Sequence, residues 1–177
     1  ITIFFVGRLY DIPYEALTGD PANYHKYHPL TGVLSNLGVL MWCATFAVCL
    51  FAGIKIKSRD FKDKKGSFLV YAGALTFLLL IDDFFMLHDS LLRQKPMYLF
   101  YGGALGYFIF RYFNLLRQSN FLLFVTAIGF FFISMAMDSV LPSRGLEYFF
   151  EDAFKFLGVV SWMLFFVITS YDSININ

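Results

Sequence analysis

Two adjacent carboxylates, Asp82 and Asp83, lie inside a segment that is otherwise apolar, and His88 and Asp89 follow in the same segment. In a membrane-spanning helix, one central aspartate raises the free energy of insertion by roughly 2.5–3.5 kcal/mol. A chain carries such groups only where they meet partners, an ion or water inside a helix bundle. Carboxylates and an imidazole could bind a cation or relay protons, and a catalytic metal would activate water.

A second polar group, formed by Glu151, Asp152 and Lys155, lies near the C-terminal end of the chain. Glu151 and Lys155 have the i,i+4 spacing that favours an ion pair on one helix, and Asp152 is three residues from Lys155. The group therefore either forms an ion pair within its own helix or supplies counter-charge for Asp82 and Asp83. The second interpretation follows because two adjacent carboxylates in a low-dielectric site do not both ionise without a nearby cation.

We expect these residues to form one site for a divalent metal ion or a proton, with Lys155 as counter-charge. The predicted ligands are the carboxylates and the imidazole of the two segments: Asp82, Asp83, His88, Asp89, Glu151 and Asp152. Asp82 and Asp89 would lie on one helix face about 10 Å apart, so they would line one cavity without chelating the same small ion. No H-x-x-x-H or E-x-x-H spacing occurs here, and a metal would need ligands from several helices. No catalytic residue is assigned.

The composition places this chain in a membrane. Of its 177 residues, 58% are hydrophobic, 21% are aromatic and 15% are charged, whereas soluble domains carry about 25% charged residues. The 24 Phe and 11 Tyr exceed what a soluble core of this size could bury. The net charge of +1 offers no field for nucleic acid. Three His are too few for several haems or chlorophylls, although one pigment or a bound lipid fits the composition.

Five apolar runs of about 20 residues predict membrane-spanning helices. They cover approximately residues 29–54, 66–92, 96–116, 120–141 and 147–171. The predicted fold is an all-α polytopic transmembrane bundle in a single domain, 1–177, with 1–28 as an outer N-terminal segment. Ile1–Gly7 is either a short interfacial piece or the tail of a further helix, which would make this bundle the remainder of six. Gly102 and Gly106 have the small-xxx-small spacing of a helix-contact face.

The loop charges predict an orientation. Residues 55–65 contain six basic residues, and Arg111 and Arg117 flank a later turn. By the positive-inside rule both turns are cytoplasmic, against weaker opposing charge at Arg93 and Lys95. The acidic residues and histidines then lie toward the other side of a bacterial inner or thylakoid-type membrane. Ser35, Asn36, Asp138, His25 and His28 would lie at a similar depth or just above it.

Three blocks carry a resemblance to a known family: Gly32–Trp42, Asp82–Asp89, and Glu151–Gly158 together with Trp162. The last two read as DD-x4-H-[DE] and ED-x2-K-x2-G. The chain resembles a family of uncharacterised bacterial multi-pass membrane proteins that is frequent in cyanobacteria. The resemblance implies a shared fold and polar cluster, with one more helix usually preceding the first block, and it transfers no activity. A looser similarity is to intramembrane metal hydrolases of the ceramidase and adiponectin-receptor type, although the H-x-x-x-H of their late helix is absent here.

Three hypotheses about function stay open, and the sequence does not decide whether the chain is an enzyme. The first is a site that binds a divalent cation or relays protons, and that hydrolyses a lipid-like substrate if a metal is catalytic. The second is a non-catalytic small subunit of a larger photosynthetic or respiratory membrane complex, whose charged residues fix helix register. The third, a proton-coupled transporter, is weakest because no inverted repeat and no proline-broken helix is evident. The expected partners are the lipid bilayer and, in the second hypothesis, other membrane subunits.

Overall fold

The computed structural model describes residues 8–9, 26–28, 30–85, 94–140 and 146–175. Its contacts divide the chain into two units, Ile1–Val33 and Leu34–Asn177, and most of the first unit lies outside the described residues. The helices that build the second unit are α4 (Val33–Arg59), α5 (Lys64–Phe85), α7 (Gln94–Gln118), α8 (Phe121–Val140) and α9 (Leu146–Asn175). Within the described part of the chain no strand occurs, and the all-α prediction is confirmed.

The observed helices begin or end at other residues than the predicted apolar runs do, because polar residues extend or cap them. α4 continues through Lys55 to Arg59, because cations are favourable near the negative C-terminal end of a helix dipole. α5 begins at Lys64, with Asp63 as its N-cap. The Asp63 Oδ1 atom accepts the backbone N–H of Lys65 at 2.6 Å and that of Gly66 at 3.2 Å. The C-terminal part of the predicted 66–92 helix lies outside the described residues.

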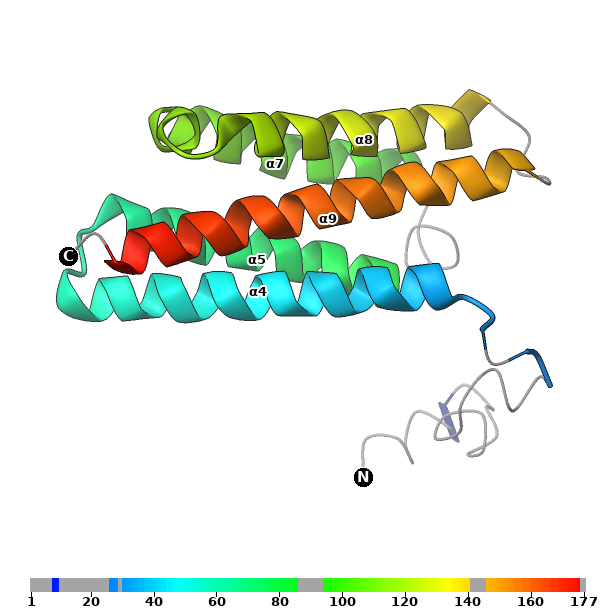
Figure 1. The fold of residues 1–177 in the computed structure, drawn as a ribbon, viewed down its shortest axis with the longest axis horizontal. Coiled ribbons are helices and arrows are strands. Elements are labelled where there is room, and N and C mark those ends of the chain that lie inside the picture. Colours follow the sequence, from blue (N-terminus) through cyan, green and yellow to red (C-terminus); the bar gives the residue numbers. More distant parts are fainter. Residues whose placement is uncertain (1–7, 10–25, 29, 86–93, 141–145, 176–177) are drawn as a thin grey trace. The chain divides into compact units, whose positions relative to one another are not determined.

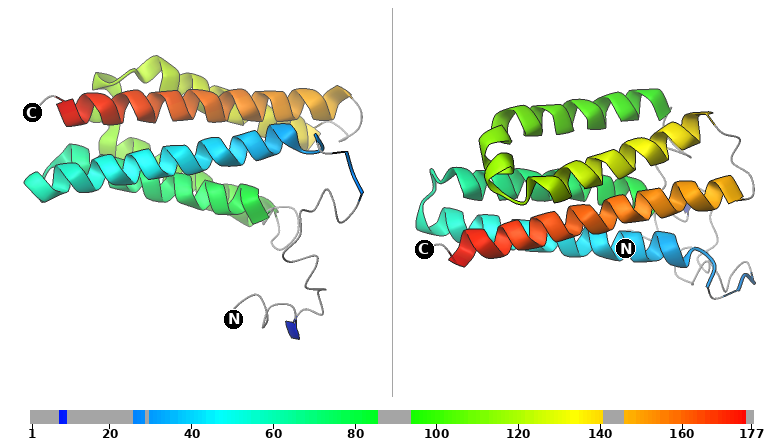
Figure 2. Two further views of the ribbon diagram at one scale, coloured as in Figure 1. Left: turned by 60° about the horizontal axis from the view of Figure 1, so that its bottom comes forward. Right: turned by 45° about the horizontal axis from the view of Figure 1, so that its top comes forward.

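Successive helices of the second unit are antiparallel, as the short connections predict. Figure 1 shows the α4–α5 turn, the α7–α8 turn and the C-terminal end of α9 at one end of this bundle. The last turn of α5, the first turn of α4 and the first turn of α9 lie at the other end (Figure 2). We call these two ends the basic end and the acidic end, after the residues 55–65 and the Asp83 and Asp152 side chains respectively.

Four helices are long and apolar enough to cross a membrane among the residues that could be searched. These are Val33–Arg59, Lys64–Phe85, Phe121–Asp138 and Phe149–Asn175. α7 occupies the predicted position but is not one of the four, since Arg111, Asn114 and four tyrosines lower its hydropathy. It also bends at Tyr112, where φ is −120° and ψ is 19°.

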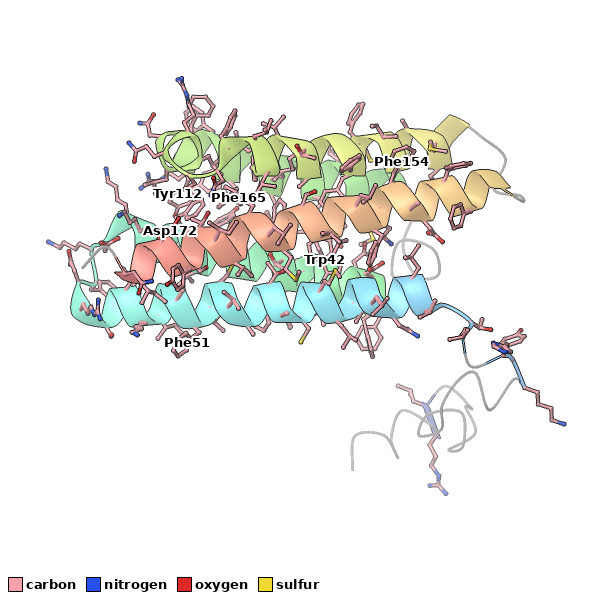
Figure 3. The ribbon with its side chains drawn as sticks, viewed as in Figure 1. Trp42, Phe51, Tyr112, Phe154, Phe165 and Asp172 are labelled. Carbon is pink, nitrogen blue, oxygen red and sulfur yellow. The ribbon has the colours of Figure 1, made fainter. Side chains whose placement is uncertain are left out.

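The core of the bundle is aromatic. Trp162 of α9 is 1% exposed, and its ring lies 6.2 Å from Trp42 of α4 and 5.8 Å from Phe124 of α8, centroid to centroid. Its indole Nε1 donates a hydrogen bond of 3.1 Å to the Thr76 hydroxyl of α5. The outer surface is also apolar: Phe51 is 66% exposed and points away from the bundle (Figure 3). Such exposure is expected where the surrounding solvent is lipid.

Close contact between α4 and α5 depends on glycines. A Cβ atom added to Gly53 would lie 2.8 Å from Val70 Cγ2 and 2.9 Å from the Val70 backbone nitrogen. A Cβ on Gly66 would lie 3.3 Å from the Gly53 carbonyl oxygen. At Gly102 and Gly106, by contrast, no atom of the described structure lies within 4 Å of an added Cβ. The predicted Gly102/Gly106 face therefore makes no close helix contact among the described residues.

Candidate functional site

A small cavity lies between α4, α5 and α9 at the acidic end of the bundle. Its volume is about 30 Å³, and it is lined by Leu34, Ser35, Gly38, Asp83, Asp152, Lys155, Phe156 and Val159. A buried water needs roughly 10–15 Å³ by this measure and two to four polar partners. The cavity therefore has room for about two water molecules, with a hydroxyl, two carboxylates and an ammonium group in its wall.

An ion pair between Lys155 and Asp83 connects α9 to α5 across this cavity. The Lys155 Nζ atom donates directly to Asp83 Oδ1, although the two residues are 72 positions apart in the sequence. The Asp83 side chain is 10% exposed, and Lys155 is half-buried. Of the two interpretations of the Glu151–Asp152–Lys155 group, the structure thus contains the one in which Lys155 meets a carboxylate of α5.

Two more carboxylates lie in the electric field of Lys155. Asp152 is almost one turn earlier on α9, lines the same cavity, and interacts electrostatically with both Lys155 and Asp83. Asp82 is 8% exposed and interacts electrostatically with Lys155 and with Tyr101 of α7. Among the residues that the structure describes, the field of this one ammonium group therefore reaches three carboxylates.

α4 contributes the wall opposite the ion pair. Ser35 brings a hydroxyl group, and Gly38 lets the helix backbone approach the acid, since an added Cβ would lie 3.9 Å from Asp83 Oδ2. That distance is an ordinary van der Waals contact, so alanine fits at this position. Ser35 and Asn36 were expected only at a similar depth, and the place of Gly38 beside the Asp83 carboxylate was missed.

The apolar lining residues Phe156 and Val159 were also missed by sequence reasoning. With Asp152 and Lys155, they have the 0, 3, 4, 7 spacing that places residues on one face of a helix. This spacing was present in the sequence and could have found them. Leu34 of α4 had no comparable signal, because the rotation of α4 toward α9 is set by packing.

The structure does not bring all of the predicted ligands together. Glu151 is half-buried and makes interactions of its own, but it does not line the cavity. His88 and Asp89 lie outside the described residues, as does His25. Asp138 is half-buried near the end of α8, and the Nδ1 atom of His28 accepts the Leu30 N–H at 3.2 Å.

The metal part of the prediction finds no support in the residues that the structure describes. Among them, no three His, Cys, Asp or Glu side chains are grouped so that they could hold a metal ion. Cys43 is exposed and Cys49 is buried, and both are free thiols. The predicted divalent-metal site with His88 and Asp89 stays a prediction.

The fold and this site define a class of protein: a helical membrane protein with a charged pair between three of its helices. The chain belongs to a family described as a domain of unknown function, DUF8692, which matches residues 1–169. The expected resemblance to an uncharacterised family is confirmed at this level, while its motifs and its bacterial distribution stay predictions. No curated protein and no solved structure gives a significant match.

Proposed function

We propose that this membrane protein binds and releases a proton at the cavity between α4, α5 and α9. One observation carries the proposal: Lys155 pairs directly with Asp83, while a second carboxylate, Asp152, lines the same water-sized cavity. The ammonium group neutralises one of these two acids. The other acid, Asp152, is half-buried, and binding a proton would neutralise it.

Asp152 is the proton carrier in this proposal. On its own helix it faces Lys155, and from α5 it faces Asp83, with Asp82 in the field of the same lysine. α4 brings the Ser35 hydroxyl and no titratable group to the cavity wall. α8 packs beside it through the Phe130–Phe154 ring contact. Its acid Asp138 lies near the same end of the bundle. Water in the cavity would connect the Asp152 carboxyl group with the Asp83–Lys155 pair.

A proton fits this cavity better than a divalent metal ion does. A divalent ion placed between Asp83 and Asp152 would lie beside the Lys155 ammonium group, and the two positive charges would repel each other in a low-dielectric site. Two carboxylates and one hydroxyl also provide fewer ligands than the six to eight oxygens that Ca²⁺ takes. The hydrolytic version of the sequence hypothesis would need the metal and is therefore not part of this proposal.

The proposal includes an orientation. The six basic residues of 55–65 lie at the end of the bundle opposite the cavity. By the positive-inside rule the basic end is cytoplasmic, so the cavity lies in the outer half of a bacterial inner or thylakoid-type membrane. The site would then exchange protons with the non-cytoplasmic side.

Infrared difference spectroscopy on the full chain in lipid nanodiscs tests the proposal. We expect a protonated-carboxyl band that disappears as the pH is raised from acidic to alkaline values, and that is lost in Asp152→Asn. In Lys155→Met the band should persist to higher pH, because the cation that favours the ionised form is gone. The matched control is Asp172→Asn, which removes an exposed acid at the basic end (Figure 3).

The alternative function, a non-catalytic subunit whose charges only fix helix register, predicts a different result. A purely structural Asp83–Lys155 network keeps the same protonation state across this pH range. An unchanged carboxyl band in Asp152→Asn, relative to both the parent chain and the Asp172→Asn control, would contradict the proton-binding function.

A further inference from the structure

The basic end of the bundle carries a concentration of positive charge that the proton-binding proposal does not use. The α4–α5 turn and its flanks contain six cationic side chains against two acids: Lys55, Lys57, Arg59, Lys62, Lys64 and Lys65, with Asp60 and Asp63. Arg117, at the α7–α8 turn, lies at the same end of the bundle (Figure 1). Asp172 is the acid of α9 at this end.

Both acids of this turn are bound to the backbone of the turn itself. Asp60 Oδ1 accepts the Lys62 N–H at 2.9 Å, and Asp63 Oδ1 accepts the N–H groups of Lys65 and Gly66. These carboxylates shape the turn and cap α5. Since six cations stand against these two acids, the turn keeps a net positive charge that attracts an external anion.

Lys57 is the most strongly positioned of these cations. Its Nζ atom lies 3.0 Å from the Ser67 hydroxyl oxygen and 4.6 Å from the centroid of the Phe61 ring. The Ser67 hydroxyl donates to the Asp63 carbonyl oxygen at 3.2 Å, so it accepts one hydrogen bond from the ammonium group. A lysine ammonium group has three N–H donors, so beyond the bond to Ser67 and the contact with the Phe61 ring it can still donate to an anion.

The neighbouring residues place this cation at the depth of the lipid headgroups. The turn directly connects two helices that are apolar enough to cross a membrane. Phe61 is 78% exposed, and an exposed aromatic ring beside snorkelling lysines is typical of the membrane–water interface. The phosphate groups of lipids lie at this interface.

We propose that the α4–α5 turn binds the phosphate headgroup of anionic phospholipids, with Lys57 at the centre of the site. The Lys57 ammonium group donates to a phosphate oxygen, and Lys64, exposed at the first turn of α5, adds charge. Ser67 and Phe61 are positioning residues that hold the Lys57 ammonium group. The site is separate from the proton-binding cavity and does not depend on it.

Native mass spectrometry of the full chain in a neutral detergent tests this proposal. The probe is an equimolar mixture of phosphatidylglycerol and phosphatidylcholine, and the measured quantity is the ratio of the two lipids retained. We expect a preference for phosphatidylglycerol that falls about fivefold for each lysine removed in Lys57→Gln and Lys64→Gln. Lys57→Arg combined with Lys64→Arg keeps both charges and should retain the preference, which separates a lost site from a misfolded protein.

The matched control removes two exposed cations from the N-terminal unit, in Arg8→Gln combined with Lys26→Gln, and should leave the ratio unchanged. An unchanged ratio in the Lys57→Gln/Lys64→Gln variant would overturn the site. Ser67→Ala keeps every charge but removes the acceptor that positions Lys57, and it should lower the preference about two- to threefold. A parent-like ratio in that variant would overturn the central role of Lys57. Displacement of the lipid by inorganic phosphate would show that the site takes free phosphate, against the proposal.

Discussion

At the scale of single residues, the Asp83–Lys155 pair is the feature on which the candidate site depends. Without Lys155, Asp83 would lose the cation that pairs with it, whereas Lys155 without Asp83 would keep only the weaker interactions with Asp152 and Asp82. Removing Lys155 alone should therefore be worse than removing both partners, because it leaves the buried Asp83 carboxylate without its cation. Losing Lys155 would also affect the neighbouring Asp152 and Asp82, because both carboxylates interact electrostatically with its ammonium group.

A double-mutant cycle tests this coupling. We expect Asp83→Asn and Lys155→Met to destabilise the bundle individually, and the double variant to be less destabilised than the sum of the two. The coupling free energy should be roughly 0.5–3 kcal/mol. It is measured from denaturation midpoints in detergent, with Asp172→Asn in place of Asp83→Asn as the uncoupled control. Additive effects within about 0.3–0.5 kcal/mol would show that the ion pair contributes nothing specific.

At the scale of secondary-structure elements, glycines decide how closely α4 approaches α5. Gly53 and Gly66 face each other across this contact, and Gly73 packs against Cys49 with an added Cβ at 3.4 Å from the Cys49 Cβ. The same close approach brings Gly38 of α4 beside Asp83. The cavity is therefore a consequence of helix packing as well as of its polar residues.

The effect of a methyl group at these glycines depends on its surroundings. Gly53→Ala should destabilise the bundle by about 1–3 kcal/mol, because the added Cβ meets Val70 backbone and must push α4 from α5. Gly102→Ala is the matched control on α7, where the position is open, and it should be neutral or slightly stabilising because alanine favours a helix. Thermal denaturation of both variants in one detergent compares them. Equal destabilisation of the two would contradict the packing described here.

At the scale of the whole molecule, the antiparallel order of the helices places the α4–α5 turn and the C-terminal end of α9 at the basic end of the bundle. The positive charge of that turn predicts that this side is cytoplasmic. The lipid-facing surface of the bundle is largely aromatic and aliphatic, with Phe110 at 86% and Leu122 at 79% exposure.

Reporter fusions in a bacterial host measure the orientation. A fluorescent protein fused after Asn177 should fluoresce, and alkaline phosphatase at the same position should be inactive, because both reporters would be cytoplasmic. A reporter inserted beside Phe61, in the α4–α5 turn, should give the same result. Phosphatase activity at either position would reverse the proposed sidedness and would place the cavity toward the cytoplasm.

The sequence by itself determined the properties that depend on local composition and periodicity. The long apolar runs predicted five helices in nearly the observed places, and the acids inside such runs identified Asp83, Asp152 and Lys155 as members of a polar site. Apolar length and the cost of charge in lipid can be read residue by residue, so these features needed no knowledge of the fold.

Only the tertiary structure decided which of these residues meet. Lys155 had carboxylates within reach on its own helix, yet it pairs with Asp83, 72 residues away, because of the rotation of α9 against α5. The same packing brought Gly38 to the cavity. The close helix contact is formed at Gly53 and Gly66, and not at the predicted Gly102 and Gly106. Rotation and separation of helices result from many long-range packing contacts at once, and no local pattern in the sequence encodes them.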